Sequence, residues 1–596
     1  MADAVPVPTD RDLASIAEAR ALARRAKEAW LELAELSQER IDAIVDAMAA
    51  AASSQAEAFA LLAVEETGYG VVEDKVQKNL FSSEKVYAFI RPMKTVGVIA
   101  RHEDRRVVEI AEPFGVVAAV VPSTNPTSTA IYKILISIKA RCAIVLSPHP
   151  AAVKCITRVA EVMNEAAIRA GAPAGSINWM RTVTLEGTQE LMKHRDVAVI
   201  LATGGMGLVR AAYSAGKPAY GVGPGNAPAY IERTADVKKA VRDIIVGKSF
   251  DNGLLCSSEN SVVVDEAIAE AVKREFQDQG GYFMSKAEMD SVARVLVTPQ
   301  RLPNPALVGK DAPFIAHKCG ITVPADTRVL IAPLEGVGRD YPLSIEKLCP
   351  VLSFYIVRDW REGCERCRQI LRYGGMGHTM SIHSQNEAII LEFGLKKPAF
   401  RIVVNTPTTH GSIGLTTGLD PAMTLGCGGY GGNITSDNIS PRHLLNIKRL
   451  AYEIAPAVSR FERPAGFPAR RPAAPPRAAA GISAEALSRR IDEFLGSRGF
   501  RSPASERGPG PRAGSADQGD ELSPPGAPQG NSPSDGRDAA PWTESAPPLE
   551  FVCEEDVRRA ILAGRKLVVS ERAIVTPSAR DLGDQHHVFA AAPSRG

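Results

Sequence analysis

The sequence predicts an α/β fold in which a parallel, doubly wound sheet is followed by a second α/β region. Residues 10 to 90 show the apolar periodicity of alanine-rich amphipathic helices. After residue 114, short apolar runs such as "GVVAAVVP" and "AIVLSP" alternate with helical stretches. This alternation is typical of a Rossmann-type sheet, which binds its ligands at the carboxyl ends of the strands. Past residue 463 the composition changes to that of a disordered C-terminal tail.

Length and composition narrow the class of protein. A chain of 596 residues is too long for one core and should form two or three domains. Its 70 basic and 68 acidic residues are balanced, so we expect no nucleic-acid partner. The N-terminus lacks the regions of a signal peptide, and no apolar run approaches the roughly 20 residues of a membrane span. We therefore expect a cytoplasmic protein that does not bind a membrane.

The nine cysteines show no regular spacing, which fits a reducing compartment. Cys364 and Cys367 form a CxxC motif, but it lies inside the amphipathic stretch "DWREGCERCRQILRYG" without a second cysteine pair. We interpret them as two thiols on a helix surface, and we expect no metal site.

The individual elements fit the same alternation of strands and helices. "TVGVIARHEDRRVVEIAEP" alternates like an exposed antiparallel hairpin over about residues 95–112. Helices are predicted at about 127–139 and 151–170, and "SINWM" and "VAVILATGG" continue the series of strands. A second mixed region runs from 237 to 430.

Fifteen of the 42 prolines fall between residues 464 and 548, a composition that predicts a disordered tether. The tether is interrupted by a predicted amphipathic helix at 482–496, which Ser483 is placed to cap and Gly496 to end. Its apolar stripe consists of Leu487, Ile491, Phe494 and Leu495. The run "EEDVRRAILAGRKLVVSERAIVTPSARDLG" predicts a helix and then a strand in a small module at 549–596.

Cys256 has unusual neighbours in the stretch "SFDNGLLCSSEN". A core cysteine usually lies among aliphatic residues, as Cys142 does in "RCAIVL", whereas Cys256 follows a loop-forming Asp-Asn-Gly. Loops on rigid scaffolds carry a large share of functional residues. Local sequence leaves both a reactive nucleophile and an ordinary thiol open.

Other polar and glycine-rich residues follow predicted strands. Asn125 in "VVPSTNPTST" could point its amide into a crevice or could cap the next helix. Thr203, Gly204 and Gly205 lie between a strand and a helix, where backbone N–H groups can approach a phosphate. Such a turn, like the later "GVGPGNAP", can also be only a tight turn.

Taken together and in order, seven segments resemble the aldehyde dehydrogenase superfamily, and specifically its coenzyme A-acylating branch, over about residues 10–460. The segments are "EPFGVVAAVVPSTNPTS", "SPHP", "TGGMGLVRAAYSAGKPAYGVGPGNAP", "SFDNGLLCSSENSVVV", "EKLCPVLSFY", "GHTMSIHS" and "TLGCGGYGGNITSDNISPRHLLNIK".

The resemblance implies a domain organisation. It gives an NAD-binding domain at 10–236 that includes the hairpin, a catalytic domain at 237–430, and a return to the cofactor domain at 431–462. The hairpin is expected to serve oligomerisation, in a homodimer or a dimer of dimers.

The resemblance also implies roles for site residues. Cys256 as thiolate would attack an aldehyde, with the Asn125 amide and the Cys256 N–H as the oxyanion hole. Glu346 would contact the nicotinamide ribose, and His149 would lie beside the adenosine ribose. The remaining residues expected to bind the cofactor are Ser123, Thr124, Thr203, Gly204, Gly205 and Gly223. The cofactor is expected to be NAD, with NADP possible.

One position departs from the hydrolytic members of the family. They carry a glutamate that activates water at the position where this chain has Val222. Because valine cannot take a proton, the thioester should await the thiol of coenzyme A as co-substrate. His378 could assist that thiol or could make a structural hydrogen bond, and both readings stay open. For His383 and His410 we expect structural roles.

We therefore expect oxidation of a short-chain aldehyde, acetaldehyde or propionaldehyde, to its acyl-CoA. The alternatives are a sulfoacetaldehyde dehydrogenase and a non-catalytic protein that organises a shell. A helix on a proline-rich tether resembles the encapsulation peptides of bacterial microcompartment enzymes, so shell proteins or co-encapsulated enzymes are expected partners of 482–496. That helix could instead dock on its own catalytic domain. The microcompartment lumen is the expected location, and residues 549–596 resemble microcompartment-associated tails.

Overall fold

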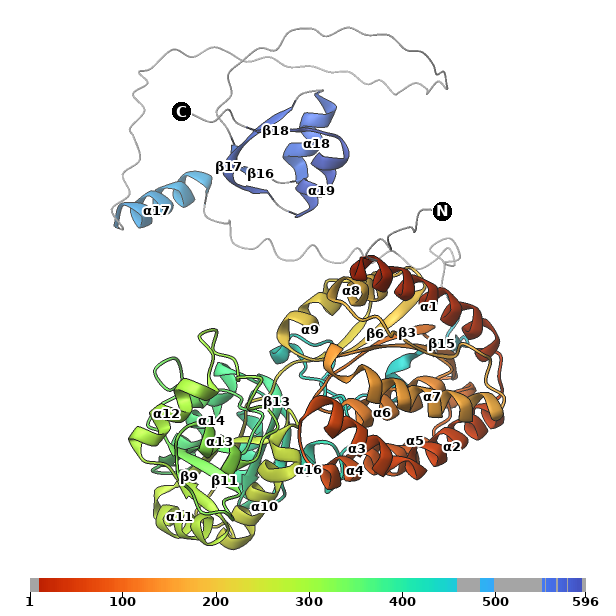
Figure 1. Cartoon of the computed structure of the whole chain (residues 1–596). Coiled ribbons are helices and arrows are strands. Elements are labelled where there is room, and N and C mark those ends of the chain that lie inside the picture. The colour runs from red at the N-terminus through yellow and green to blue at the C-terminus, as the bar shows by residue number, and fades with distance from the viewer. Residues whose placement is uncertain are drawn as a thin grey trace, which may run out of the picture. The chain divides into compact units, whose positions relative to one another are not determined.

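The computed structural model of the protein describes residues 10–457, 483–497, 549–552, 554–563, 566–575 and 577–591 (Figure 1). The chain divides into two compact units, Met1–Ala465 and Gly466–Gly596. Apart from the helix that interrupts it, the predicted tether lies outside the described residues.

The first unit begins with a layer of helices whose starts follow from their capping residues. Asp10 accepts the Asp12 N–H at 2.9 Å at the start of the first helix, and Ser37 caps the second. The small buried alanines of the first helix allow close packing. The helices are α1 (Arg11–Leu33), α2 (Gln38–Ser54), α3 (Ala56–Thr67), α4 (Val72–Leu80), a π-helical turn η1 (Phe81–Val86) and α5 (Tyr87–Ile90).

A five-stranded parallel sheet with the order β5-β4-β3-β6-β7 follows. Its strands are β3 (Val116–Val121), β4 (Ala143–Pro148), β5 (Ile177–Trp179), β6 (Val197–Thr203) and β7 (Ala219–Val222). Helices α6 (Pro126–Lys139) and α7 (Val153–Arg169) cover one face, and α1, α8 (Leu185–Lys193) and α9 (Met206–Tyr213) the other (Figure 1). The strand order reverses between β3 and β6, and a ligand crevice is expected at such a switch point.

A seven-stranded parallel sheet with the order β10-β11-β12-β9-β8-β13-β14 forms the second half of this unit. Strand β8 precedes residue 237, where the sequence predicted a domain boundary, yet it pairs in this sheet. The strands are β8 (Ala227–Ile231), β9 (Glu259–Asp265), β10 (Gly281–Phe283), β11 (Val329–Pro333), β12 (Val351–Val357), β13 (Gly377–His383) and β14 (Ala399–Val404). The helices are α10 (Val237–Ser249), α11 (Ala269–Asp278), α12 (Lys286–Leu296), α13 (Ala312–Lys318), α14 (Trp360–Tyr373), α15 (Glu387–Leu395) and α16 (Thr408–Ser412).

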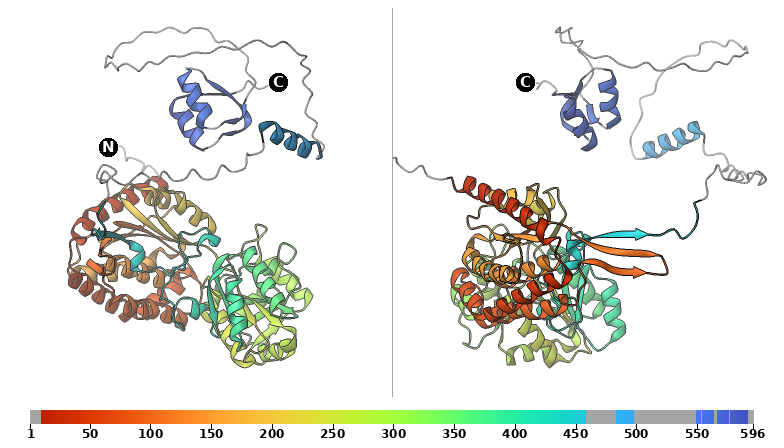
Figure 2. Two further views of the ribbon diagram at one scale, coloured as in Figure 1. Left: turned by 180° about the vertical axis from the view of Figure 1, so that it is seen from behind. Right: turned by 90° about the vertical axis from the view of Figure 1, so that its right-hand side faces the viewer.

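The expected hairpin is present as β1 (Gly97–His102) and β2 (Val107–Pro113), which pair antiparallel. A third strand, β15 (Leu445–Ala451), pairs antiparallel with β2. The right-hand view of Figure 2 shows the three strands extending away from the rest of the first unit. A role of this sheet in oligomerisation stays a prediction.

The second unit contains α17 (Ala484–Ser497), where the sequence predicted an amphipathic helix. Ser483 Oγ accepts the Ala486 N–H at 3.2 Å, as expected of its cap. Leu487 and Ile491 are 51% and 47% exposed, and the side chains of Phe494 and Leu495 lie outside the description. The C-terminal module has a parallel sheet of β16 (Leu549–Val552), β17 (Leu567–Val575) and β18 (Phe589–Ala591) with helices α18 (Glu554–Leu562) and α19 (Pro577–Gln585). The predicted helix followed by a strand is confirmed by α18 and β17.

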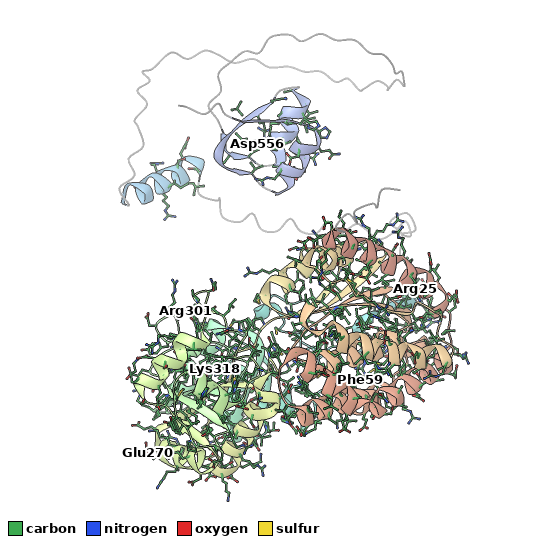
Figure 3. The ribbon with its side chains drawn as sticks, in the orientation of Figure 1. Arg25, Phe59, Glu270, Arg301, Lys318 and Asp556 are labelled. Carbon is green, nitrogen blue, oxygen red and sulfur yellow. The ribbon has the colours of Figure 1, made fainter. Side chains whose placement is uncertain are left out.

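Charged side chains of the outer helices mostly point into solvent, as Glu270 of α11 and Lys318 of α13 do (Figure 3). Several lysines of the first unit are instead fully buried, among them Lys75, Lys78 and Lys347. Buried charges need partners, so these lysines mark places where the interior is built around polar groups. No single described helix has the length and apolar character of a membrane span, although the bent pair α2 and α3 reaches that threshold together.

Candidate active site

A cavity of about 490 Å³ lies where the carboxyl ends of β3, β4, β6 and β7 face the loop that carries Cys256. Ten of the residues that the sequence singled out line it, from segments more than two hundred positions apart in the chain. They are Ser123, Thr124, Asn125, His149, Thr203, Gly204, Gly205, Gly223, Cys256 and Glu346. Val222 lines it as well. The fold therefore brings these predicted residues together at one cavity.

Cys256 follows a tightly bent segment, in which Asp251 and Asn252 have φ of 47° and 53°. Non-glycine residues rarely adopt this left-handed conformation, so the surrounding structure must hold it in place. The opposing turn fits closely against the loop, since a Cβ placed on Gly225 would lie 2.0 Å from the Cys256 carbonyl oxygen. Among the described cysteines only Cys256 and Cys364 are partly exposed. The expectation that Cys367 lies on a helix surface is wrong, because its side chain on α14 is fully buried in the hydrophobic core.

The Cys256 thiol is paired with a histidine. Sγ of Cys256 lies 3.2 Å from Nε2 of His378, and Nδ1 of His378 lies 2.9 Å from Thr379 Oγ1. Burial raises the pKa of Cys256 to about 12, and the negative charge of Glu346 adds to the rise. Burial lowers the pKa of His378 to about 3, with a smaller contribution from the Arg401 charge.

Both groups are therefore neutral at pH 7. In the tautomer that carries its proton on Nδ1, the thiol donates to Nε2 and Nδ1–H donates to Thr379 Oγ1. At this distance Nε2 is within hydrogen-bond reach of the thiol proton, but a pKa of about 3 makes the imidazole a weak base toward a thiol whose pKa is about 12. The sequence left open whether His378 assists the thiol of coenzyme A or makes a structural hydrogen bond. The geometry allows a chemical role, but the group that His378 contacts is the Cys256 thiol.

Asn125 precedes α6, but its side chain makes no capping hydrogen bond to that helix. The capping alternative therefore does not describe this amide. Its Oδ1 accepts from Lys78 Nζ at 2.7 Å, and its Nδ2 donates to Thr124 Oγ1 at 3.1 Å. Nδ2 also lies 3.5 Å from the Leu254 carbonyl oxygen, two residues before the cysteine. The amide N–H groups thus face the nucleophile loop.

Glu346 accepts the Gly225 N–H at 3.0 Å, and burial raises the pKa of its carboxyl to about 7. Val222 ends β7, is 3% exposed and offers no group that could take a proton.

Another part of the cavity wall is formed by the turn between β6 and α9. Thr203 Oγ1 is buried there without a hydrogen-bond partner among the described residues. A Cβ on Gly205 would meet nothing within 4 Å, so the turn leaves open space beside this residue. An orphaned hydroxyl beside an open turn at a helix start suits a ligand with hydrogen-bonding and anionic groups.

The other histidines differ in their settings. Nδ1 of His149 accepts the Ala151 N–H at 3.2 Å at the end of β4, and the residue lines the cavity. Nδ1 of His410 lies 2.9 Å from Thr409 Oγ1, and His383 is 1% exposed with Nε2 unpaired among the described residues. Neither His383 nor His410 lines the cavity. No group of three or more His, Cys, Asp or Glu in the described part of the chain could hold a metal ion.

Sequence reasoning missed three residues around the site. Lys75 and Lys78 form ion pairs with Asp251 inside the protein. The sequence pattern of their helix is amphipathic, which predicts that its lysines are exposed to solvent. The one local signal was the polar loop around Asp251, which gave no hint of its partners.

Known proteins match the chain over its first unit. The sequence model described as "Aldehyde dehydrogenase family" matches residues 8–291. The succinate-semialdehyde dehydrogenase (acetylating) of Clostridium kluyveri is 38% identical over 431 residues, which are 72% of this chain and 95% of that protein. The chain belongs to the aldehyde dehydrogenase family. The family predicted from the sequence is thereby confirmed.

Other relatives extend the comparison. The bifunctional aldehyde-alcohol dehydrogenase AdhE of Escherichia coli is 43% identical over 442 residues, 73% of this chain. The chain spans about half of the length of that relative, 50%.

Among solved structures, an acetylating aldehyde dehydrogenase from Geobacillus thermoglucosidasius has a TM-score of 0.75 at 50% identity, covering 76% of this chain and 100% of the other. A propionaldehyde dehydrogenase from the fucose utilisation microcompartment of Clostridium phytofermentans has a TM-score of 0.66 at 30% identity, covering 72% and 96%. The predicted α/β class is confirmed by this likeness.

Proposed function

We propose that the chain is a CoA-acylating aldehyde dehydrogenase that oxidises a short-chain aldehyde to its acyl-CoA with NAD, through a thioester on Cys256. The observation that carries this proposal is the Cys256–His378 pair, with Sγ and Nε2 3.2 Å apart. Cys256 lines the cavity together with Asn125 and Val222, whereas His378 contacts the thiol without lining the cavity. The printed names of several relatives, acetylating or propionaldehyde dehydrogenases, support the same chemistry.

The open wall of the cavity fits a nicotinamide dinucleotide. The orphaned Thr203 Oγ1 and the space at Gly205 are the features such a group would fill. Bound there, the cofactor would supply a hydride acceptor. The residues proposed to hold it are Ser123, Thr124, His149, Thr203, Gly204, Gly205, Gly223 and Glu346. One solved relative, an engineered glycolyl-CoA reductase, has NADP⁺ bound, so NADP remains an alternative.

The protein's own groups can carry out the covalent steps. Cys256 Sγ forms a bond to the aldehyde carbon and gives its proton to Nε2 of His378. The developing oxyanion accepts from Asn125 Nδ2 and the Cys256 N–H, and each such donor is worth on the order of a hundredfold in rate. Loss of hydride from the adduct leaves the acyl group as a thioester on Cys256. Attack by the thiol of coenzyme A then gives acyl-CoA and restores Cys256, and one proton leaves to solvent.

Val222 explains why coenzyme A rather than water would take the acyl group. Its side chain is buried at the cavity wall and cannot act as a general base. Without a base, water attack on the thioester is slow, so a better nucleophile competes successfully. A relative from Rhodopseudomonas palustris has been solved with bound CoA and an acylated cysteine, which supports this order of events.

The test is an absorbance assay for NADH with NAD and aldehyde, run with and without coenzyme A. Steady turnover only with coenzyme A is the expected result. Sustained turnover without it, yielding free acid, would contradict the acylating assignment. No turnover with any aldehyde would favour the non-catalytic, shell-organising alternative.

The aldehyde itself is proposed to be neutral and short, acetaldehyde or propionaldehyde. The sulfoacetaldehyde dehydrogenase of Acholeplasma is 36% identical over 434 residues, so an anionic aldehyde is the closest rival. Arg401 is a buried cation whose charge acts on Cys256. Its guanidinium, however, donates to the Ser436 and Gly426 carbonyls and lies 3.4 Å from Asn438 Oδ1. Because Arg401 is already engaged, we favour the neutral substrate, and kcat/KM over a panel of both classes decides between them.

We further propose that α17 targets the enzyme to a bacterial microcompartment by binding shell proteins or co-encapsulated enzymes. The exposed Leu487 and Ile491 on one helix support this, as does the microcompartment origin of one solved relative. Fusing residues 480–500 to a fluorescent protein should give punctate fluorescence in cells that make microcompartments. Diffuse fluorescence, unchanged by Leu487→Asp, would contradict targeting.

A further inference from the structure

Three buried charged side chains, Lys75, Lys78 and Asp251, and the half-buried Asp74 form a cluster beside the cavity. Lys75 and Lys78 of α4 both pair with Oδ2 of Asp251, Lys75 at 3.0 Å. The two lysine side chains are 2% exposed and the Asp251 side chain is fully buried. Asp74 completes the cluster, since its Oδ2 accepts the Asp251 N–H at 2.7 Å. Buried ion pairs are costly to form and are kept where they fix a geometry.

Asp251 lies five residues before Cys256, on the nucleophile loop itself. Its Oδ1 accepts the Val71 N–H at 2.8 Å at the start of α4, and a Cβ on Gly70 would lie 1.9 Å from that oxygen. This close fit, together with the left-handed φ of 47° at Asp251, fixes the position of the nucleophile loop against the start of α4.

Lys78 connects the same cluster to Asn125. Its Nζ donates to Asn125 Oδ1 at 2.7 Å. An ammonium group has three donors and no acceptor, so the amide atom it meets must be the oxygen. The amide nitrogen is then turned the other way, toward the Leu254 carbonyl of the nucleophile loop at 3.5 Å.

We propose that Lys78 is a positioning residue that fixes the orientation of the Asn125 amide and, through Asp251, ties it to the loop of Cys256. The Asn125 amide contacts Lys78 directly, and the loop that carries the Cys256 N–H contacts it through Asp251. The two proposed oxyanion donors are thus both connected to one buried lysine. This inference rests on the proposed function, because it assumes that Asn125 donates to the oxyanion. Preorganised donors stabilise a transition state because they need no reorientation during the reaction.

Lys75 offers a matched control. It lies on the same helix, is equally buried and pairs with the same carboxylate oxygen. Its second partner is the Thr124 carbonyl at 3.3 Å, and among the described residues its Nζ makes no hydrogen bond to the Asn125 side chain. Replacing either lysine with methionine leaves Asp251 one ammonium partner, but only Lys78→Met removes the donor to Asn125.

The experiment compares kcat of Lys78→Met and Lys75→Met in the full-length enzyme. Lys78→Met should lose about as much as Asn125→Ala, on the order of a hundredfold, with little change in KM. Lys75→Met should keep most of the rate. The double variant Lys78→Met/Asn125→Ala should be no slower than Asn125→Ala alone, because both changes remove one interaction. Additive losses, or equal losses in the two lysine variants, would overturn the inference.

A second measurement separates the amide from the loop. Alkylation of Cys256 by iodoacetamide, followed by mass spectrometry of its peptide, develops no oxyanion. Its rate should therefore be the same in Lys78→Met and in the unmodified sequence. A fall in alkylation that matches the fall in kcat would show that Lys78 acts through the nucleophile loop alone, which would also overturn the inference.

The outcomes also separate this inference from the proposed function. If Asn125→Ala leaves kcat unchanged, the oxyanion role itself fails. If Asn125→Ala slows the enzyme and Lys78→Met does not, only the inference fails. Should Lys78→Met not fold, Lys78→Met/Asp251→Asn removes one buried charge of each sign. Measured against Asp251→Asn, it should show the same loss, and an unchanged rate there would overturn the inference.

Discussion

The two walls of the cavity are built in opposite ways. On the turn wall, Thr203 Oγ1 has no partner among the described residues and the Gly205 Cβ position faces open space. The part of the wall around Cys256 and Asn125 is the cysteine wall, and both of these side chains are hydrogen-bonded. Next to it, Gly225 fits against the backbone of Cys256 without room for a methyl group. Polar groups without protein partners are suited to bind a ligand that dissociates again. Side chains that are hydrogen-bonded to one another are suited to a reaction that needs a fixed geometry. Substitutions on the two walls should therefore have different consequences.

The largest effect is expected on the cysteine wall from Asn125→Ala. It should lower kcat by about a hundredfold because one oxyanion donor is lost. The side chain caps no helix, but its loss removes one acceptor from the buried Lys78 ammonium, so the free energy of unfolding should fall by about 1–3 kcal/mol at most. NADH production and thermal unfolding measure the two quantities. A large loss of stability with normal specific activity would assign Asn125 a structural role instead.

Val222→Glu should change the product rather than the total rate. A carboxylate at this position would supply a base for water, and a positioned base typically contributes about 10²–10⁴-fold. We expect the ratio of free acid to acyl-CoA to rise by at least about tenfold, at some cost in stability from burying the carboxylate. Val222→Gln, which has the same size without a base, is the control. An unchanged ratio in a folded Val222→Glu enzyme would remove Val222 from the explanation.

A pair of glycine variants compares the walls directly. Gly225→Ala would place a methyl carbon 2.0 Å from the Cys256 carbonyl oxygen, so the backbone must shift. Overpacking of this kind costs about 1–3 kcal/mol of unfolding free energy. Gly205→Ala meets no atom within 4 Å and should leave the free energy of unfolding nearly unchanged while raising the KM for NAD. Equal losses of stability in the two variants would contradict the contrast between the walls.

The remaining prediction concerns the pH dependence of stability. Burial raises the pKa of Glu346 to about 7, so between its ordinary value of 4.5 and 7 the folded state keeps a proton that the unfolded state releases. This carboxyl therefore lowers stability increasingly as pH rises from about 4.5 to 7, with no further change above. Glu346→Gln should gain stability relative to the unmodified protein over that window, by about 3 kcal/mol in total. A constant difference across the window in denaturant unfolding would contradict this.

Much of the cavity could be predicted because its residues follow strands. Asn125, His149 and Thr203 each stand at or just past the carboxyl end of a strand whose apolar run is evident, and parallel strands gather such ends at one edge. The Cys256 loop was found from its unusual composition and from the family resemblance. Val222 was predicted because it lies in a glycine-rich turn at the position where the hydrolytic members of the family carry a glutamate.

The support behind the site could not be predicted in the same way. Lys78 and Asp251 are 173 positions apart, and neither residue type is expected inside a protein. Their pairing depends on how α4 packs against the nucleophile loop, which no local pattern specifies. The same reason hides the third strand of the hairpin sheet, because β15 pairs with β2 across more than three hundred residues. Local periodicity predicts elements, but long-range pairings of polar groups depend on the completed fold.

The central claim is that Cys256 carries the acyl group until coenzyme A removes it. The most direct measurement is mass spectrometry of the enzyme after mixing with NAD and propionaldehyde in the absence of coenzyme A. The peptide that contains Cys256 should gain the mass of a propionyl group, lose it on addition of coenzyme A with release of propionyl-CoA, and show no gain in Cys256→Ala. The absence of an adduct in the active enzyme, or its discharge to free acid as fast as to coenzyme A, would contradict the account.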